Sequence, residues 1–252
     1  MDLISLDIYL IAGAVAVLAG VVKGMVGFAM PMIIVSGVGS FSAPEVALAA
    51  LLFPTLVSNI VQTAHGGFGN ALRAVWAYRL YLAIVLVMIV LSAQLVPLVP
   101  KDLFYLLIGL PITGLALIQL AGWRPDITGR NGLGLQALVA TFAGFMGGIS
   151  GLWGVPTTMY LTAAHTPKQQ QMQIQGVVYG LGSVALVLAH LKSGVLDWPA
   201  ARFSTAMVVP AMLGMVLGLR LQRRIDQDRF RQITLAVLVL AGLNLIRRGL
   251  WI

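Results

Sequence analysis

A lysine lies in the middle of an apolar segment near the start of the chain. Lys23 belongs to the stretch "AGVVKGMVGFAMP", Ala19 to Pro31, in which three glycines and a proline also interrupt the pattern of a helix. A lysine at the centre of a membrane helix costs on the order of 3 kcal/mol, so it is expected to face a partner or water. The apolar depth of the chain offers no aspartate or glutamate as that partner, and a bound anion would supply the missing charge. The alternative is that Lys23 extends along its flexible stem to the membrane interface.

A second stretch repeats this interrupted pattern. It is "AGFMGGISGLWGVP", Ala143 to Pro156. Irregular backbone at membrane depth is tolerated where protein or water satisfies it, so a break of this kind usually lines a cavity. The proline of each stretch falls early in a new helix, and the start of a helix carries about half a positive charge and free N–H groups that suit an anion.

The glycines of these stretches have a second explanation, because small residues four apart let membrane helices pack closely. We favour packing for Gly20 and Gly144. We favour a binding role for the glycines that cluster before each proline, which are Gly24, Gly27, Gly148 and Gly151.

Polar side chains on two later spans could complete an anion site. Thr55, Asn59 and Gln62 share one helix face, and Gln171, Gln175 and Tyr179 share another. Their alternative role is hydrogen bonding between helices, worth about 0.6 kcal/mol each. We favour that role for Gln62 and Gln171, near the span ends, and binding for Asn59 and Gln175. Trp153, inside the second break, either gates the cavity or only packs. The candidate substrate-binding residues are Lys23, Gly24, Gly27, Phe28, Asn59, Gly148, Gly151, Trp153, Gly154, Thr157, Gln175 and Tyr179.

The composition is that of an all-α, polytopic membrane protein. Of 252 residues, 59% are hydrophobic and 10% are charged, against about 25% charged residues in soluble domains. Apolar runs long enough to cross a bilayer recur from end to end. The net charge of +8 comes from basic residues at the ends of these runs, so nucleic acid is not an expected partner. The first seven residues lack the basic region of a cleaved signal peptide, and the first span is expected to remain.

Several kinds of chemistry are disfavoured by the residues present. The chain has no cysteine, and its histidines, His65, His165 and His190, form no metal-binding pair. No P-loop is present, so neither ATP nor any other cofactor is expected. Ser150 lies in "GGISGLWG", which lacks the G-x-S-x-G spacing of a hydrolase nucleophile. We therefore expect that the protein is not an enzyme.

The chain reads as two copies of one unit. Gly20, Gly24, Gly27 and Pro31 match Gly144, Gly148, Gly151 and Pro156, and "DLF" at 102–104 matches "DRF" at 228–230. The predicted repeats are 1–126 and 127–252, which together form one membrane domain. Each repeat begins with a broken segment, 8–38 or 133–164. The further predicted spans are 44–64, 78–98 and 102–121 in the first repeat, and 169–190, 202–219 and 229–246 in the second.

Two topologies are compatible with these segments. If each broken segment is one span, eight crossings result, and eight basic residues lie on one side and seven on the other. If each is a hairpin that returns to its own side, three crossings remain per repeat and the repeats are inverted. Ten basic residues then lie on one side of the membrane and five on the other. The positive-inside rule favours this second arrangement, with both termini outside. The predicted cytoplasmic residues are Arg73, Arg79, Arg124, Arg130, Lys168, Arg220, Arg223, Arg224, Arg229 and Arg231.

The two motifs of the form "AGxxxGxxG…P", at Ala19 to Pro31 and Ala143 to Pro156, resemble those of the TauE/SafE family of sulfite and organosulfonate exporters. The resemblance covers the whole chain. It implies a multi-pass transporter of the bacterial inner membrane, with its site at the glycine-rich segments. Lys23 and the smaller number of glycines in "GMVGFAMP" depart from the family pattern.

The expected function is therefore secondary transport, with export of a small sulfur-containing anion such as sulfite or an organosulfonate. The alternatives are a passive anion channel and an intramembrane enzyme. The expected partners are a small anionic substrate and the lipid bilayer, and assembly into a homo-oligomer stays open.

Overall fold

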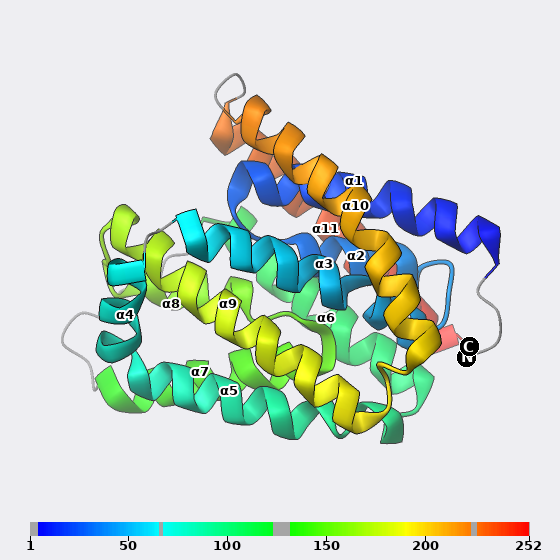
Figure 1. Ribbon diagram of the computed structural model, residues 1–252, viewed down its shortest axis with the longest axis horizontal. Helices are drawn as coiled ribbons and strands as arrows, with labels where there is room; N and C mark the ends of the chain where they lie inside the picture. The colour runs from blue at the N-terminus through cyan, green and yellow to red at the C-terminus, as the bar shows by residue number, and fades with distance from the viewer. Residues whose placement is uncertain (1–4, 66–67, 123–131, 223–225, 252) are drawn as a thin grey trace.

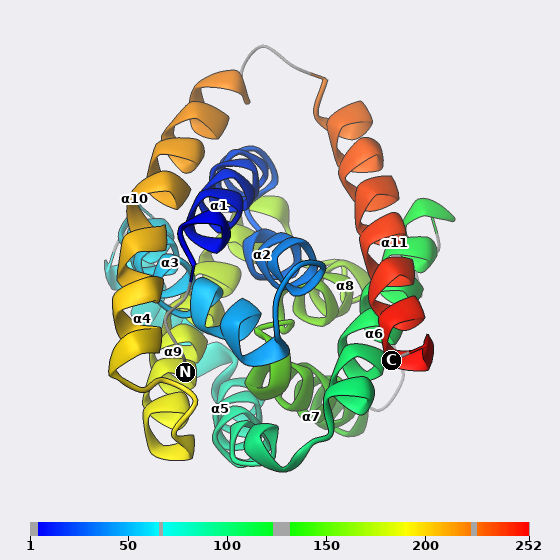
Figure 2. The same ribbon diagram turned by 90° about the vertical axis from the view of Figure 1, so that its right-hand side faces the viewer.

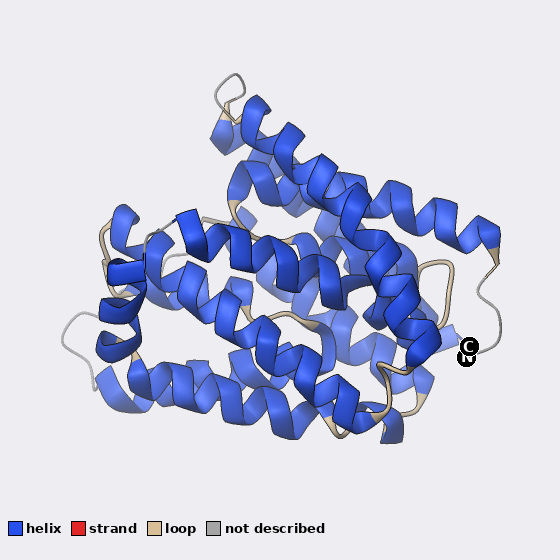
Figure 3. Cartoon of the chain, in the orientation of Figure 1, coloured by secondary structure: helices blue, strands red, loops and turns tan. Residues whose placement is uncertain are grey.

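The computed structural model describes residues 5–65, 68–122, 132–222 and 226–251. These described residues are mostly helical, with short loops between the helices, and include no strand (Figure 3). Eight helices within these described ranges are long and apolar enough to cross a membrane, so the chain is a multi-pass membrane protein. The helices of the first half are α1 (Leu6–Val26), α2 (Met30–Gly39), α3 (Pro44–His65), α4 (Phe68–Ala77), α5 (Arg79–Ala93), the 3-10 helix η1 (Val96–Leu98) and α6 (Lys101–Leu120). Those of the second half are α7 (Gly132–Ser150), α8 (Gly154–Ala163), α9 (Lys168–Ser193), α10 (Trp198–Leu221) and α11 (Gln227–Trp251).

The predicted spans lie within a few residues of the observed helices, with one correction. The broken segments 8–38 and 133–164 correspond to α1 with α2 and to α7 with α8. The helix α4, however, was not predicted between the spans 44–64 and 78–98. It has only ten residues, and its exposed Leu72 and Trp76 mark it as a short amphipathic helix, which hydropathy over a whole span does not reveal. Of the predicted cytoplasmic residues, Arg124, Arg130, Arg223 and Arg224 lie outside the described residues.

Each break consists of a long helix, a left-handed turn and a short helix. Gly27 ends α1 with a φ of 81°, and its N–H donates to the carbonyl of Lys23 over 2.8 Å. Gly151 follows α7 with a φ of 76°, and its N–H donates to the carbonyl of Gly147 over 2.7 Å. Glycine adopts this conformation without the steric cost that a Cβ brings. The ten residues of α2 and of α8 reach about 15 Å each, half of a bilayer core.

The long helix before each break packs on a helix of the other half. In the first pair, Gly20 of α1 lies against the backbone of Ala211 and Gly24 against that of Met215, so α1 and α10 run in the same direction. In the second pair, α7 and α5 also run in the same direction, and Gly144 lies against Val85. In the order of the helices, α10 of the second half corresponds to α5 of the first, as α7 corresponds to α1. The contact of α1 with α10 and that of α7 with α5 are therefore equivalent (Figure 1).

Corresponding helices of the two halves run in opposite directions where they meet. Asn59 of α3 bonds to the carbonyl of Tyr179 on α9, whereas Thr63, one turn later, bonds to that of Gly176. The helices α6 and α11 show the same relation, since a Cβ on Gly109 would lie 2.9 Å from the carbonyl oxygen of Gly242, and one on Gly249 would lie 2.7 Å from that of Asp102. Antiparallel counterparts are the geometry that inverted repeats require. How the halves sit in the bilayer stays a prediction.

The short helices lie inside the bundle. Figure 2 shows α2 and α8 near the centre, with α1 and α10 on one side and α6 and α11 on another. The buried residues of α2 include Met30, Ile34 and Val35, and those of α8 include Val155 and Leu161. The fold therefore brings both breaks, 124 residues apart in the sequence, into its interior.

Candidate functional site

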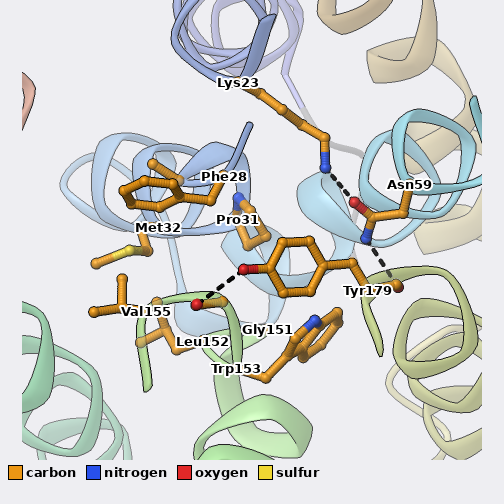
Figure 4. Close-up of a pocket in the computed structure, with 12 residues that line it drawn as sticks. Lys23, Phe28, Pro31, Met32, Asn59, Gly151, Leu152, Trp153, Val155 and Tyr179 are labelled. Atoms are coloured by element: carbon orange, nitrogen blue, oxygen red, sulfur yellow. Dashed lines mark hydrogen bonds between the residues drawn. The ribbon is translucent and has the colours of Figure 1, made fainter. Parts of the chain in front are cut away.

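The two breaks touch each other at the centre of the molecule. A Cβ on Gly151 would lie 3.1 Å from the Cβ of Pro31, and one on Gly154 would lie 3.8 Å from that of Phe28. A small cavity lies between them (Figure 4). It is lined by Lys23, Phe28, Ala29, Pro31, Met32, Asn59, Gly151, Leu152, Trp153, Gly154, Val155 and Tyr179.

Lys23 points its amine into this cavity from the last turn of α1. The residue is only 3% exposed, and Nζ donates a hydrogen bond to Oδ1 of Asn59. The side chain therefore does not extend to a membrane interface, the alternative that the sequence left open. None of the described residues that line the cavity is acidic. A positive charge on Lys23 would have a neutral amide as its partner.

Asn59 links three helices at this point. Its Nδ2 donates to the backbone carbonyl of Tyr179 over 3.1 Å, which leaves Oδ1 to accept from Lys23. The residue is 2% exposed. Because both ends of the amide are used, its orientation is fixed by α9 on one side and by the amine on the other. Asn59 thus holds α1, α3 and α9 together beside the cavity.

Tyr179 connects α9 to the start of α8. Its hydroxyl donates to the carbonyl of Gly154 over 2.9 Å and lies 3.1 Å from Oγ1 of Thr158. Gln175, one turn earlier on α9, donates from Nε2 to the same Thr158 oxygen over 3.1 Å. The ring of Tyr179 forms part of the cavity wall (Figure 4). This polar chain fixes the position of the second break relative to α9.

Both short helices present their N-termini at the cavity. Ala29 caps α2 and Trp153 caps α8, and neither cap makes a side-chain hydrogen bond to its helix. The first N–H groups of a helix have no partner within that helix, and the helix dipole adds a partial positive charge there. The cavity thus combines two helix starts with one buried amine, and all three features attract negative charge.

A comparison with known families agrees with the architecture. The profile of the family described as Sulfite exporter TauE/SafE matches residues 12–245. The chain belongs to the TauE/SafE family. A search of curated proteins finds no match, and a search of solved structures also finds none. Membership of an exporter family makes the chain a membrane transporter.

Most residues predicted for the site of this TauE/SafE protein do meet at the cavity. Those that line it are Lys23, Phe28, Asn59, Gly151, Trp153, Gly154 and Tyr179. Gln175 is joined to it through Thr158. Gly27, which forms the turn after α1, and Thr157 are not among the residues that line the cavity. Thr157 lies one turn into α8, where its hydroxyl bonds to the carbonyl of Trp153 over 2.7 Å and contacts the hydroxyl of Tyr81 at 2.9 Å.

Two of the predicted glycines lie outside the cavity, in contacts between helices. A Cβ on Gly24 would collide with the carbonyl oxygen of Met215 on α10. A Cβ on Gly148 would collide with the hydroxyl of Ser92 and the backbone of Ile89 on α5. Both glycines therefore play the packing role that was expected for Gly20 and Gly144. The reason is geometric: each of these glycines lies on the side of its long helix that packs against the other half of the molecule, and so it faces α10 or α5.

The remaining lining residues were not among the candidates. They are Ala29, Pro31, Met32, Leu152 and Val155. Each lies in one of the two breaks or in the first turn after it. Their positions next to the glycines in the sequence could therefore have identified them as lining residues, although their side chains carry no charge.

The cavity is small in this structure. Its volume is about 20 Å³, in a measure where roughly 10–15 Å³ holds one water molecule. Trp153 closes its lower wall and is 1% exposed. The indole packs against glycines, since a Cβ on Gly147 would lie 2.8 Å and one on Gly182 3.4 Å from its ring atoms. A sulfite or sulfonate group has at least four heavy atoms and would need the two breaks to separate.

Proposed function

We propose that this chain is a secondary transporter that exports a small sulfur-containing anion, such as sulfite or an organosulfonate, across the bacterial inner membrane. The cavity between the two breaks is its substrate site. The observation that carries the proposal is the buried amine of Lys23, which faces a neutral amide beside two helix N-termini. An ionisable residue of this kind inside a membrane protein usually marks a substrate pathway.

An anion fits these groups better than a cation or a neutral solute does. The oxygens of a sulfonate can accept hydrogen bonds from an ammonium and from backbone N–H groups at helix starts. Asn59 and Tyr179 supply neutral polar groups at the rim. A cation would meet two positive helix ends and find no acidic side chain among the described residues that line the cavity.

The antiparallel contacts of α3 with α9 and of α6 with α11 support two inverted repeats, each a hairpin followed by three crossings. Inverted repeats allow one site to open to either side when one half rocks against the other. The small cavity fits the closed stage of such a cycle. An open pore, as in a passive anion channel, would need a continuous path at this point.

A wider cavity of about 440 Å³ would serve as the entrance on the proposed cytoplasmic side. It lies between α4 and the start of α9 and is lined by Arg73, Ala74, Ala77, Pro167, Gln170, Gln173 and Ile174. A basic residue at the mouth raises the local concentration of anions. Gln175 and Thr158 then lead along α9 and α8 toward Tyr179.

The first experiment is a screen of the purified protein for stabilising ligands. Sulfite, thiosulfate, sulfoacetate, taurine and simple carboxylates are compared by thermal shift, because a ligand of the folded state raises its unfolding temperature. We expect a sulfur oxyanion or sulfonate to stabilise the wild type and to lose at least about tenfold in affinity in Lys23→Met, which corresponds to about 1.4 kcal/mol. Lys101→Met, an exposed change at the start of α6, is the control.

Transport is then measured in proteoliposomes with the anion found in the screen. A carrier shows saturable flux and counterflow, whereas a channel shows neither. Unchanged anion binding in Lys23→Met would show that this cavity is not the substrate site. An anion flux that rises linearly with the anion concentration would indicate a channel and contradict a carrier.

A further inference from the structure

Lys23 is a buried amine whose described environment supplies a hydrogen bond but no acidic side chain. The residue is 3% exposed and contacts the amide oxygen of Asn59. An ion that leaves water without a counter-ion loses far more free energy than a neutral amide contact returns, so such groups tend to give up their charge. When no anion is bound, this environment therefore favours the uncharged amine.

The hydrogen bonds around Lys23 do not require an ammonium. Nδ2 of Asn59 is committed to the carbonyl of Tyr179, so Oδ1 is the atom that faces the amine. A neutral amine still carries two N–H groups, and one of them is enough to satisfy Oδ1. The arrangement in Figure 4 is thus complete without a charge on the lysine.

No other described group provides that charge. Tyr179 is the titratable residue that shares the cavity with Lys23, and its hydroxyl donates its proton to the carbonyl of Gly154. Tyr160 of α8 stacks on Tyr81, with ring centroids 5.4 Å apart. Helix α2 has no titratable residue. The other titratable residues of α1, α3, α9, α10 and α11 lie toward the ends of these helices and are Asp7, Tyr9, Glu45, His65, Lys168, His190, Lys192, Arg202, Arg220, Asp228, Arg229, Arg231, Arg247 and Arg248.

We propose that Lys23 couples the binding of the anion to the uptake of one proton. The neutral amine accepts a proton from water as the anion enters, and the ammonium that forms pairs with the anion. When the anion leaves, the ammonium returns its proton to the water on that side. The inference rests on the proposed function, since it requires that an anion binds here.

This coupling changes what drives transport. A monovalent anion that moves together with one proton carries no net charge, so its flux does not respond to the membrane potential. Efflux is then driven by the outward gradient of the anion and is opposed by an inward proton gradient. A carrier whose lysine stays charged throughout would instead move one negative charge per cycle.

The test is calorimetry with methanesulfonate, which stays ionised at every relevant pH and so brings no proton of its own. Titrations in two buffers with different heats of ionisation give the number of protons taken up per anion. At about pH 8 we expect close to one proton for the wild type, and an affinity that falls by up to about tenfold per pH unit as the pH rises. Lys101→Arg should match the wild type.

Two variants of Lys23 separate the coupling from binding. Lys23→Arg keeps a permanent charge, so it should bind the anion without proton uptake and with an affinity that does not depend on pH. Lys23→Met should bind weakly and take up no proton. Thermal unfolding shows whether each variant folds, and if the arginine is not accommodated, the wild type and Lys23→Met decide the question.

The outcomes distinguish the coupling from the function on which it rests. Binding to the wild type without proton uptake, or unchanged uptake in Lys23→Met, would overturn the coupling and leave anion transport standing. If methanesulfonate, sulfite and thiosulfate all fail to bind the wild type, the substrate site itself is wrong, and the coupling falls with it.

Discussion

Pro31 and Gly151 face each other across the two breaks, and a Cβ on Gly151 would lie 3.1 Å from that of Pro31. Pro31 lies in the first turn of the short helix α2, and Gly151 directly follows the long helix α7. The two halves of the molecule therefore meet at their breaks, where the chain reverses direction in each half. Any change in their separation alters the cavity directly, because both residues line it.

Gly151→Ala should disturb both the backbone and this contact. Its φ of 76° costs an L-residue about 1–2 kcal/mol, and the added methyl group presses on Pro31. We expect a lower unfolding temperature together with weaker anion binding. Gly194→Ala is the matched control, since Gly194 ends α9 with a φ of 79° and a Cβ there meets nothing within 4 Å. The control should lose stability alone. Equal binding in both variants would contradict a role for Gly151 in shaping the site.

Gly24→Ala tests whether this glycine serves packing, as the structure indicates. The new methyl group would meet the backbone of α10 at Met215 and Gly218, so we expect a loss of about 1–3 kcal/mol from the forced separation of the helices. Gly13 lies on the same helix, and a Cβ there meets nothing within 4 Å. Gly13→Ala should therefore be neutral or stabilise by about 0.5–1 kcal/mol, the helix preference of alanine over glycine. Thermal unfolding in detergent measures both, and a Gly24→Ala protein as stable as the wild type would argue against the packing role.

The repeats, the long helices and both breaks could be predicted from the sequence because apolar runs and Gly/Pro interruptions are local signals. The helix α4 could not, since its ten residues are too few to give the signal of a membrane span. Lys23 and Asn59 were both candidates, but their direct contact depends on how α1 packs beside α3. The division of the glycines between packing and cavity likewise depends on the neighbours of each helix. Those neighbours, α10 and α5, belong to the opposite halves.

The proposed inverted topology can be tested by labelling introduced cysteines, because the natural chain has none. Leu98 and Trp198 are suitable positions, 77% and 75% exposed after α5 and at the start of α10. Gln94 near the end of α5 bonds to the carbonyl of Ala189 near the end of α9 over 3.1 Å, so these ends lie together.

Inverted repeats place Leu98→Cys and Trp198→Cys on one side of the membrane, and the positive-inside rule makes that side external. A membrane-impermeant maleimide applied to intact cells should label both. Eight plain crossings would place the two positions on opposite sides. Labelling of only one position before lysis, and of both after it, would support that alternative and rule out the inversion.

Asn59→Leu should weaken both the fold and the site, because one amide serves both. The change removes the acceptor of Lys23 and the donor to the carbonyl of Tyr179, and loss of buried partners costs about 1–3 kcal/mol. Asn244→Leu is a matched control: Nδ2 of Asn244 donates to the hydroxyl of Ser40 over 2.7 Å, between α11 and the end of α2 and away from the residues that line the cavity. Both variants should unfold at lower temperature, but only Asn59→Leu should also lose anion affinity, by about tenfold for 1.4 kcal/mol. If Asn59→Leu kept its affinity at a reduced unfolding temperature, the amide would hold the helices together without orienting the amine toward a ligand.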